Sequence, residues 1–398
     1  MAKEIVQSTD HWVPPCPLNN DYPNKFNLKC ITTIEDLNTI IASYRNPDGT
    51  YPIMGFDTET TGLSPEEDSI VGYSFAFNDM DAYYVPVNHV NFGLGDQALD
   101  IIYNTMLTTE LVLMYNARFD IRMMEWNHFE DEDLSFKKQF IEQARMWYKY
   151  DMSKVKVYDV QVLVWATYTK NYMPKLKWAE LQFLGWRSQT FSETQGSASN
   201  FAYLDPLDPN TYVYAATDAI ALILLYKKLK WMRDEGKLSL QMHASGKMIP
   251  LTRFEETPIL VDLPLLKKQS EYFHNKLAET EQRVYNIVGY PFNISSGPAR
   301  AAAFKAKNII ITETTRSGAV ATGADVIEAA KKKFDKDSDQ YILLDLCTEF
   351  LHLRKMISTY IDSLYDQTAE HEFRPGRFRY SYRNTGTTSG RYSGGTWG

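Results

Sequence analysis

The chain has 398 residues, more than one ordinary domain requires, so we expect two or three domains. Hydrophobic residues make up 44% of the chain, the mean hydropathy is −0.38, and no apolar run approaches the roughly 18 residues of a membrane span. The net charge of −8 excludes a general basic footprint for nucleic acid, so a nucleic-acid enzyme would depend on divalent metals or local basic patches.

The first half of the chain alternates strand and helix signals. Residues 1–25 are rich in Pro and Asn and are predicted to form an N-terminal arm. A capping box, Thr32-x-x-Glu35, predicts a helix that runs to about residue 45. Strands are expected over residues 29–32, 51–60, 69–77, 82–87 and 111–115, with a helix over 97–107 before the last of them.

Helical patterns dominate after these strands. An aromatic-rich helical pattern covers residues 136–172, and Asp208-Pro209 predicts the start of a helix that reaches about Glu235. Three strands that can pair antiparallel, a helix, a further strand and then helices predict an α/β fold. We expect a mixed sheet covered by helices, on the ribonuclease-H-like plan, and place this domain at residues 26–237.

The pattern changes beyond residue 237. Long helices are predicted over residues 263–288, closed by Gly289, and over 338–366, so residues 238–370 are expected to form a mainly helical domain. The lysine run at 331–333 is expected to lie on a solvated face. Residues 371–398 form a basic tail, whose arginines are Arg374, Arg377, Arg379, Arg383 and Arg391.

Two carboxylates lie two residues apart on a predicted strand. Because a strand alternates its faces, Asp57 and Glu59 point the same way. Two like charges on one buried face are costly without a cation. A solvated sheet face is the commoner explanation of Asp-x-Glu, but the apolar run Ile53-Met54-Gly55-Phe56 before it indicates a central strand.

Two further pairs follow in the chain. Asn116-x-x-x-Asp120 lies at a predicted strand-to-helix junction, where by itself it would be a cap and a surface acid. Tyr214 and Asp218 lie one turn apart on one face of a predicted helix. Each pair alone is weak, but the three pieces occur in a set order, each on the expected element.

In this order the pieces resemble the proofreading exonuclease superfamily with four acidic ligands and a tyrosine. The resemblance implies a 3′-to-5′ exonuclease that releases nucleoside 5′-monophosphates with two divalent cations, Mg²⁺ or Mn²⁺, about 4 Å apart. It implies that Asp57 bridges both metals and that Glu59 and Asp218 complete the site of the metal that binds the attacking water. Asp120 would hold the second metal, partly through water, and Tyr214 would orient the nucleophilic water.

This match spans roughly Ile53 to Leu229. Within it, Leu63 has the family position that wedges against the terminal base, although an ordinary core leucine explains it nearly as well. Leu63 and Asn116 are the residues here that we expect to contact nucleic acid. Asp159 resembles a helix-start acid of the same superfamily and is predicted to be structural.

A second resemblance covers residues 250–398. The segment 254–262 resembles the entry to the thumb of family A DNA polymerases, and 292–296 resembles the next signature. Residues 355–362 resemble the end of the second thumb helix, and 385–394 resemble the first palm motif. Four pieces in the correct order after a proofreading domain are specific, and the proteins that the chain most resembles are phage-type replicative polymerases.

The resemblance implies that the chain binds DNA, both the primer-template duplex and a single-stranded 3′ end. A thumb grips the duplex backbone, which needs donors and cations. The predicted contacts in this half are Ser358, Thr359, Arg379, Arg383, Thr388 and Arg391, with Arg391 beside the primer terminus. The alternative for the tail is a disordered basic end.

The family's palm aspartates and fingers helix do not appear before Gly398. We therefore expect polymerase activity only with a second polypeptide that carries the palm and fingers, unless the sequence is a truncated polymerase. Two alternatives stay open: a free-standing 3′-5′ exonuclease acting on RNA or DNA, and a primer-template binding module. The complete acid set argues against a module without nuclease activity.

The expected location is the cytoplasm, or the host cytoplasm if the protein is phage-encoded, with no membrane partner. The N-terminus lacks the apolar core of a signal peptide. The cysteines Cys16, Cys30 and Cys347 show neither zinc spacing nor a disulfide framework, which suits a reducing compartment.

Overall fold

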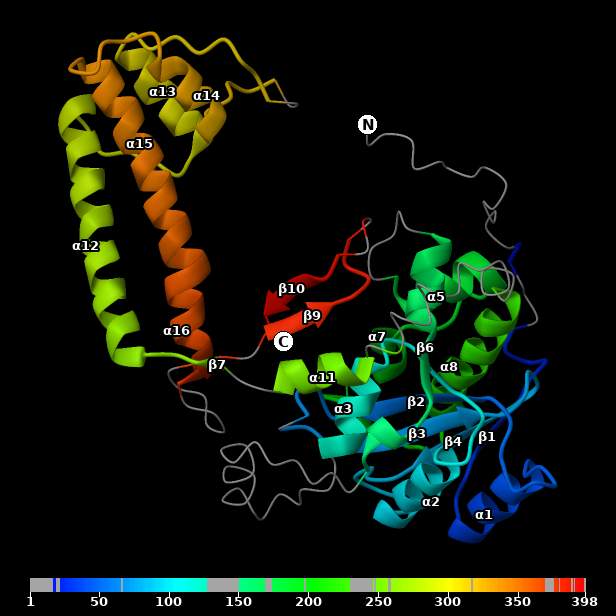
Figure 1. Cartoon of the computed structure of the whole chain (residues 1–398). Coiled ribbons are helices and arrows are strands. Elements are labelled where there is room, and N and C mark those ends of the chain that lie inside the picture. The colour runs from blue at the N-terminus through cyan, green and yellow to red at the C-terminus, as the bar shows by residue number, and fades with distance from the viewer. Residues whose placement is uncertain are drawn as a thin grey trace. The chain divides into compact units, whose positions relative to one another are not determined.

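The computed structural model forms two compact units, one of residues 1–257 with 379–398 and one of residues 258–378 (Figure 1). The residues that it describes are 17–18, 22–65, 67–126, 150–168, 174–196, 198–229, 246, 248–256, 259–315, 318–368, 376–378, 380–387, 389 and 391–396. Among these, no helix is long and apolar enough to cross a membrane.

The first unit is built on a six-stranded sheet with the order β1-β4-β3-β2-β5-β6. Its strands are β1 (Asn27–Cys30), β2 (Met54–Thr60), β3 (Ile70–Ala76), β4 (Asp81–Pro86), β5 (Val112–Met114) and β6 (Val157–Asp159). Strand β3 runs antiparallel to its two neighbours, β2 and β4. Strand β5 runs parallel to β2 on one side and to β6 on the other. The mixed sheet predicted from the element order is therefore confirmed.

Helices cover both faces of this sheet. One core joins it to α1 (Ile34–Ser43), α2 (Asp96–Met106), α3 (Arg118–Trp126) and α11 (Met248–Glu256). The core on the opposite face contains α5 (Val160–Thr167) and α8 (Pro209–Lys228). Between these two helices the chain forms α6 (Leu176–Ala179), a π-helix (Glu180–Leu184), α7 (Phe191–Gln195) and a 3₁₀ turn (Phe201–Tyr203). This is the predicted α/β, ribonuclease-H-like arrangement.

The close approach of α8 to β2 depends on a glycine. A Cβ atom built on Gly55 would clash with the backbone carbonyl of Ala219 in α8 and also crowd Ile223. Gly55 lies on the same side of β2 as Asp57, because side chains alternate along a strand. The missing side chain therefore lets α8 cross the strand next to the predicted acids.

The helix starts agree with the sequence in one case and differ in another. Asp208 caps α8 by accepting a hydrogen bond from the Asn210 amide, with Pro209 in the first turn, as predicted. The predicted cap at Thr32 is wrong by one residue, since the Thr33 side chain accepts from the Asp36 amide. The N-cap is the residue just before the helical backbone angles begin. With two adjacent threonines, the sequence alone does not show which of them has that place.

Two other helical predictions fall partly outside the described residues. The helix predicted to reach about Glu235 ends at Lys228 with Leu229 as its C-cap, and residues 230–235 lie outside the described residues. So do residues 136–149 and 169–172 of the pattern at 136–172. The described part of that pattern contains a 3₁₀ turn (Met152–Lys154), strand β6 and α5 instead of one helix. Strand β6 has only three residues, which is too short to give a period of its own.

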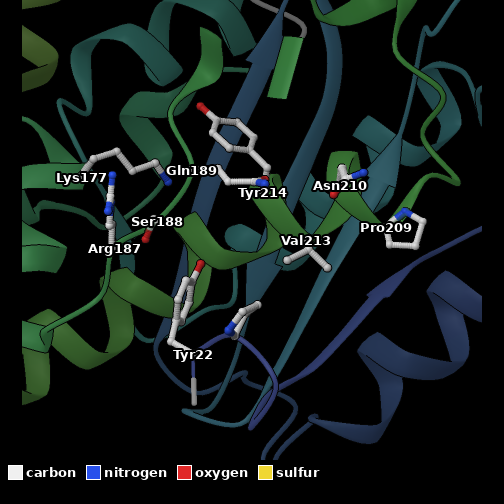
Figure 2. Close-up of a pocket in the computed structure, with 10 residues that line it drawn as sticks. Tyr22, Lys177, Arg187, Ser188, Gln189, Pro209, Asn210, Val213 and Tyr214 are labelled. Carbon is white, nitrogen blue, oxygen red and sulfur yellow. The ribbon is translucent and has the colours of Figure 1, made fainter. Parts of the chain in front are cut away.

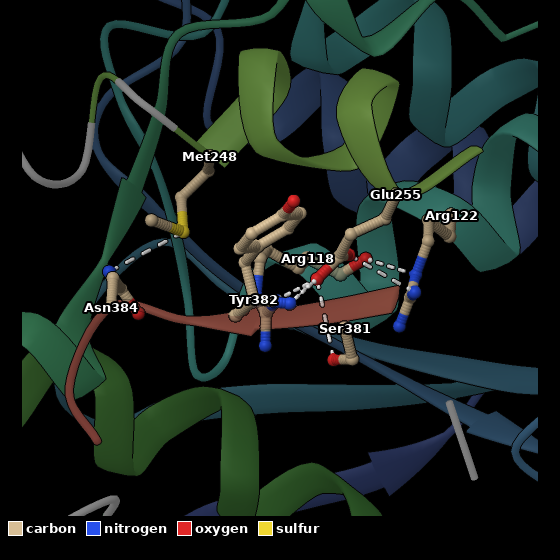
Figure 3. Close-up of polar contacts among 7 residues, drawn as sticks. All are labelled: Arg118, Arg122, Met248, Glu255, Ser381, Tyr382 and Asn384. Atoms are coloured by element: carbon tan, nitrogen blue, oxygen red, sulfur yellow. Dashed lines mark hydrogen bonds and ion pairs between the residues drawn. The ribbon is translucent and has the colours of Figure 1, made fainter. Parts of the chain in front are cut away.

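The tail after residue 379 packs onto the first unit as a hairpin of β9 (Tyr380–Arg383) and β10 (Ser393–Thr396). Glu255 of α11 accepts a hydrogen bond from the Tyr382 amide at 2.6 Å and forms ion pairs with Arg118 and Arg122 of α3 (Figure 3). Arg118 also donates to the Tyr382 carbonyl. The buried Glu255 carboxylate thus ties the hairpin to α3.

The second unit is mainly helical, as predicted. Its elements are α12 (Leu263–Val288), α13 (Gly297–Ala306), α14 (Ala324–Lys331), α15 (Asp339–Met356), a π-helix (Ile357–Asp362), α16 (Ser363–Thr368) and the short strands β7 (Ile259–Leu260) and β8 (Arg377–Phe378). Gly289 closes α12 in the left-handed conformation, as expected. Lys331 departs from the predicted solvated face, since it is only 9% exposed and pairs with Glu328 and Asp345.

Candidate metal centre

Three of the predicted acids meet at one place in the first unit. Oxygen atoms of Asp57, Glu59 and Asp218, one from each residue, all lie within 4.8 Å of one another. Asp57 and Glu59 are partly accessible to solvent, and Asp218 is buried. The cluster is therefore recessed but can be reached from solvent.

Secondary structure explains why these residues converge. Asp57 and Glu59 follow Gly55 on the α8 side of β2, and Asp218 precedes the Ala219 whose carbonyl lies against Gly55. Strand β2 pairs with β5 only through Met54 and Gly55, so its carboxyl end extends beyond its parallel neighbour. The acids thus occupy the carboxyl end of a central strand that there pairs with β3 but not with β5, a common place for binding sites in α/β sheets.

Asp120 reaches this end of β2 from the opposite face. It lies in the first turn of α3, and its Oδ1 accepts hydrogen bonds from the Thr58 amide at 3.0 Å and the Thr58 hydroxyl at 2.7 Å. Asp120 lies outside the three-carboxylate cluster, but its charge contributes to raising the pKa of Asp57. The structure therefore brings the fourth predicted acid close to the other three.

Asp159 holds the turn that positions Asp120. As the N-cap of α5 it accepts from the Gln161 amide, and it also accepts from the amides of Asn116 and Ala117. Asn116 itself adopts a left-handed conformation, with φ of 57°. Asn116 lies between the end of β5 and the start of α3. The role predicted for Asp159 as a helix-start acid agrees with this geometry.

The electrostatics of the cluster favour a bound cation. Burial, followed by the charges of Asp120, Asp218 and Glu59, raises the pKa of Asp57 well above its usual range. Burial and the nearby Asp218 raise the pKa of Glu59 in the same way. Burial also raises the pKa of Asp120 to about 7, although the Thr58 hydrogen bonds oppose the rise. A divalent cation would relieve this repulsion, and hard carboxylate oxygens fit Mg²⁺ or Mn²⁺.

Sequence reasoning missed Lys177. Its ammonium forms an ion pair with Asp218, lies 3.5 Å from the Glu180 carboxylate and sits 4.8 Å from the centroid of the Tyr214 ring. Burial lowers the pKa of Lys177, but Asp218 and Glu180 outweigh it and raise the pKa overall. In sequence, Lys177 and Glu180 look like an ordinary surface pair on a helix, so no local signal indicates the contact with Asp218.

Tyr214 stands beside the acids, as predicted. It lies one turn before Asp218 on α8, and its ring also contacts Phe201 with 6.1 Å between centroids. Burial and the negative charges of Glu59 and Asp218 raise the pKa of its phenol, so Tyr214 is neutral at pH 7 and can act as a hydrogen-bond donor.

The predicted nucleic-acid contacts are dispersed over both units. Leu63 is 66% exposed in the turn after β2, so the alternative of a core leucine is wrong. Ser358 and Thr359 are exposed on the π-helix of the second unit. Arg383 and Arg391 are exposed in the hairpin region. The predictions for Arg379 and Thr388 lie outside the described residues.

Comparison with protein families identifies both halves of the chain. Residues 28–233 match the model of a 3′-5′ exonuclease, and residues 263–395 match that of DNA polymerase family A. This chain belongs to DNA polymerase family A. It carries the family's 3′-5′ exonuclease domain and the start of its polymerase domain, so both predicted family resemblances are confirmed, while the resemblance to phage-type polymerases stays a prediction.

Relatives from bacteria support the assignment. DNA polymerase I of Pseudomonas aeruginosa is 26% identical over 355 residues, covering 86% of this chain and 35% of the relative. DNA polymerase I of Chloroflexus aurantiacus is 24% identical over 377 residues, covering 91% and 36%. The chain thus spans about a third of the length of these relatives, and neither of these two is a phage protein.

A solved structure shows the same fold. The POL domain of Pol1 from M. smegmatis, in complex with DNA primer-template and dNTP, matches with a TM-score of 0.65 at 14% identity. The match covers 92% of this chain and 54% of that one. At this identity the comparison establishes the fold and leaves the chemistry to the residues of this chain.

Proposed function

We propose that this chain is a metal-dependent 3′-5′ exonuclease that edits DNA for a family A polymerase and releases nucleoside 5′-monophosphates. The observation that carries the proposal is the cluster of Asp57, Glu59 and Asp218 within 4.8 Å, inside the domain that matches the exonuclease family. Asp120 lies next to Thr58 at the same strand end. The bound ions would be two divalent cations, Mg²⁺ or Mn²⁺.

Each residue of the centre has a separate task in this proposal. Asp57, Glu59, Asp218 and Asp120 would hold the cations, which when bound would make a water nucleophilic and stabilise the leaving alkoxide. Tyr214, with its neutral phenol, would donate a hydrogen bond that orients the attacking water. The pair of Asp57 and Glu59 on one strand keeps two carboxylates fixed without loop ordering.

The chain's own surface supplies the binding of the DNA end. Exposed Leu63, next to the carboxyl end of β2, is suited to pack against the terminal base. Ser358, Thr359, Arg383 and Arg391 would contact the primer-template backbone. Templated synthesis would require palm and fingers from a second polypeptide or from a longer form of this chain. The comparisons give no support to a second polypeptide, so it stays a prediction.

The test is digestion of a 5′-labelled single strand by the full chain with Mg²⁺. We expect the labelled strand to shorten from its 3′ end and the Asp57→Ala, Glu59→Ala double variant to lose the activity. Asp79→Asn is the matched control, because Asp79 is an exposed acid of the same unit that pairs with Lys227. Wild-type activity in the double variant would show that the centre is assigned wrongly.

The same assay separates DNA from RNA as substrate. The match of residues 263–395 to DNA polymerase family A favours DNA. We therefore expect a DNA strand to be degraded faster than an RNA strand of the same sequence. Faster degradation of RNA would favour the alternative of an exoribonuclease.

A further inference from the structure

A lysine–glutamate pair beside the metal centre has no task in the proposed reaction. Lys177 is the second residue of α6 and Glu180 begins the π-helix that follows, so they are three residues apart on consecutive turns. The ammonium of Lys177 contacts Asp218 and lies 3.5 Å from Glu180. Lys177 is therefore placed between one carboxylate of the centre and one outside it.

Glu180 is an unusual residue to find in this position. Its side chain is 0% exposed, and the polar groups that face its carboxylate are the Lys177 ammonium, 3.5 Å away, and the Ser188 hydroxyl. The adjoining cavity of about 320 Å³ is lined by residues that include Tyr22, Ser188 and Lys177 (Figure 2). A fully buried carboxylate is costly unless it is paired, so the charge of Glu180 needs a cationic partner.

Lys177 is that partner, but its ammonium also forms an ion pair with Asp218. Asp218 is one of the three residues whose oxygens cluster within 4.8 Å, so a divalent cation held there would draw on the carboxylate that Lys177 contacts. Two cations on one carboxylate repel each other. The ammonium contacts Asp218 and already lies 3.5 Å from Glu180, so the flexible lysine stem can move fully to Glu180 when a cation takes Asp218.

Resting on the proposed cation site, we propose that Lys177 competes with the divalent cation for Asp218 and that Glu180 receives the ammonium when the cation binds. Lys177 is then a positioning residue that keeps Asp218 oriented and paired. Glu180 lowers the energy of the arrangement in which Asp218 is released to the cation. The pair thereby sets the affinity of the centre.

The test is titration of the full chain with Mn²⁺ alone, followed by calorimetry. Removing the competitor in Lys177→Met should tighten Mn²⁺ binding at least about tenfold, which corresponds to 1.4 kcal/mol. Removing the alternative partner in Glu180→Gln should weaken binding several-fold. In the double variant the Glu180→Gln substitution should have no further effect, because the lysine that it acts through is gone.

Controls keep the outcome interpretable. Lys177→Arg retains a cation and should bind Mn²⁺ within about threefold of wild type, which makes the proposal testable even if Lys177→Met folds poorly. Lys227→Met removes an exposed lysine of the same unit and should change nothing. Weaker or unchanged Mn²⁺ binding in a folded Lys177→Met, or an equal effect of Glu180→Gln with and without Lys177, would overturn the proposal.

The experiment also distinguishes this proposal from the one on which it rests. If Asp57→Ala with Glu59→Ala abolishes Mn²⁺ binding and the Lys177 variants do not alter it, the metal centre stands and the competition does not. If the double acid variant still binds Mn²⁺ like wild type, the metal centre itself is assigned wrongly.

Discussion

The ion cluster around Glu255 gives a prediction whose size follows from burial. The Glu255 side chain is 0% exposed, and its partners Arg118 and Arg122 are 7% and 11% exposed. Glu255→Gln keeps the shape but leaves two buried guanidinium groups without this carboxylate. Removing one partner of a buried pair costs about 3–5 kcal/mol, so we expect the free energy of unfolding of the first unit to fall by that amount.

Tryptophan fluorescence in a denaturant titration measures this loss without interference from the second unit. All 8 tryptophans lie outside residues 258–378 and therefore report the first unit. Asp79→Asn is the control, because the Asp79–Lys227 pair is 46% and 56% exposed and should be worth no more than about 1 kcal/mol. An equal midpoint shift in Glu255→Gln and Asp79→Asn would refute the argument from burial.

Three further outcomes are expected. Gly55→Ala should destabilise the first unit by about 1–3 kcal/mol and reduce exonuclease activity, measured in parallel, because the new methyl group displaces α8 from β2. Burial raises the pKa of Asp159 to about 6 from 3.8, so its contribution to stability falls as pH rises between these values. The deficit of Asp159→Asn in denaturation should therefore be larger at pH 4 than at pH 7. Leu63→Ala should leave stability within about 0.5 kcal/mol but raise KM for a single-stranded 3′ end, since the side chain is 66% exposed.

The elements that the sequence predicts well are those with a long run of one hydrophobic pattern or with an unambiguous boundary residue. The helix Leu263–Val288 spans many turns and ends at a glycine with φ of 96°, so pattern and cap agree. Strand β6 has three residues and no room for a period, and its place in the sheet comes from pairing with β5. The lysine run predicts a solvated side chain for Lys331, but an ion pair with Asp345 on another helix holds it against the protein.

The same distinction applies within the centre. Asp57 and Glu59 can be assigned to one face because strand alternation is local. The contact between Lys177 and Asp218 joins residues 41 positions apart, and nothing in either local pattern encodes it. Spacing therefore predicts the carboxylates of the proposed cation site, whereas the position of Lys177 beside Asp218 comes from the packing of α6 and the π-helix against α8. For this reason, the acid spacing alone would not place a lysine beside Asp218, and that contact has to be read from the packing.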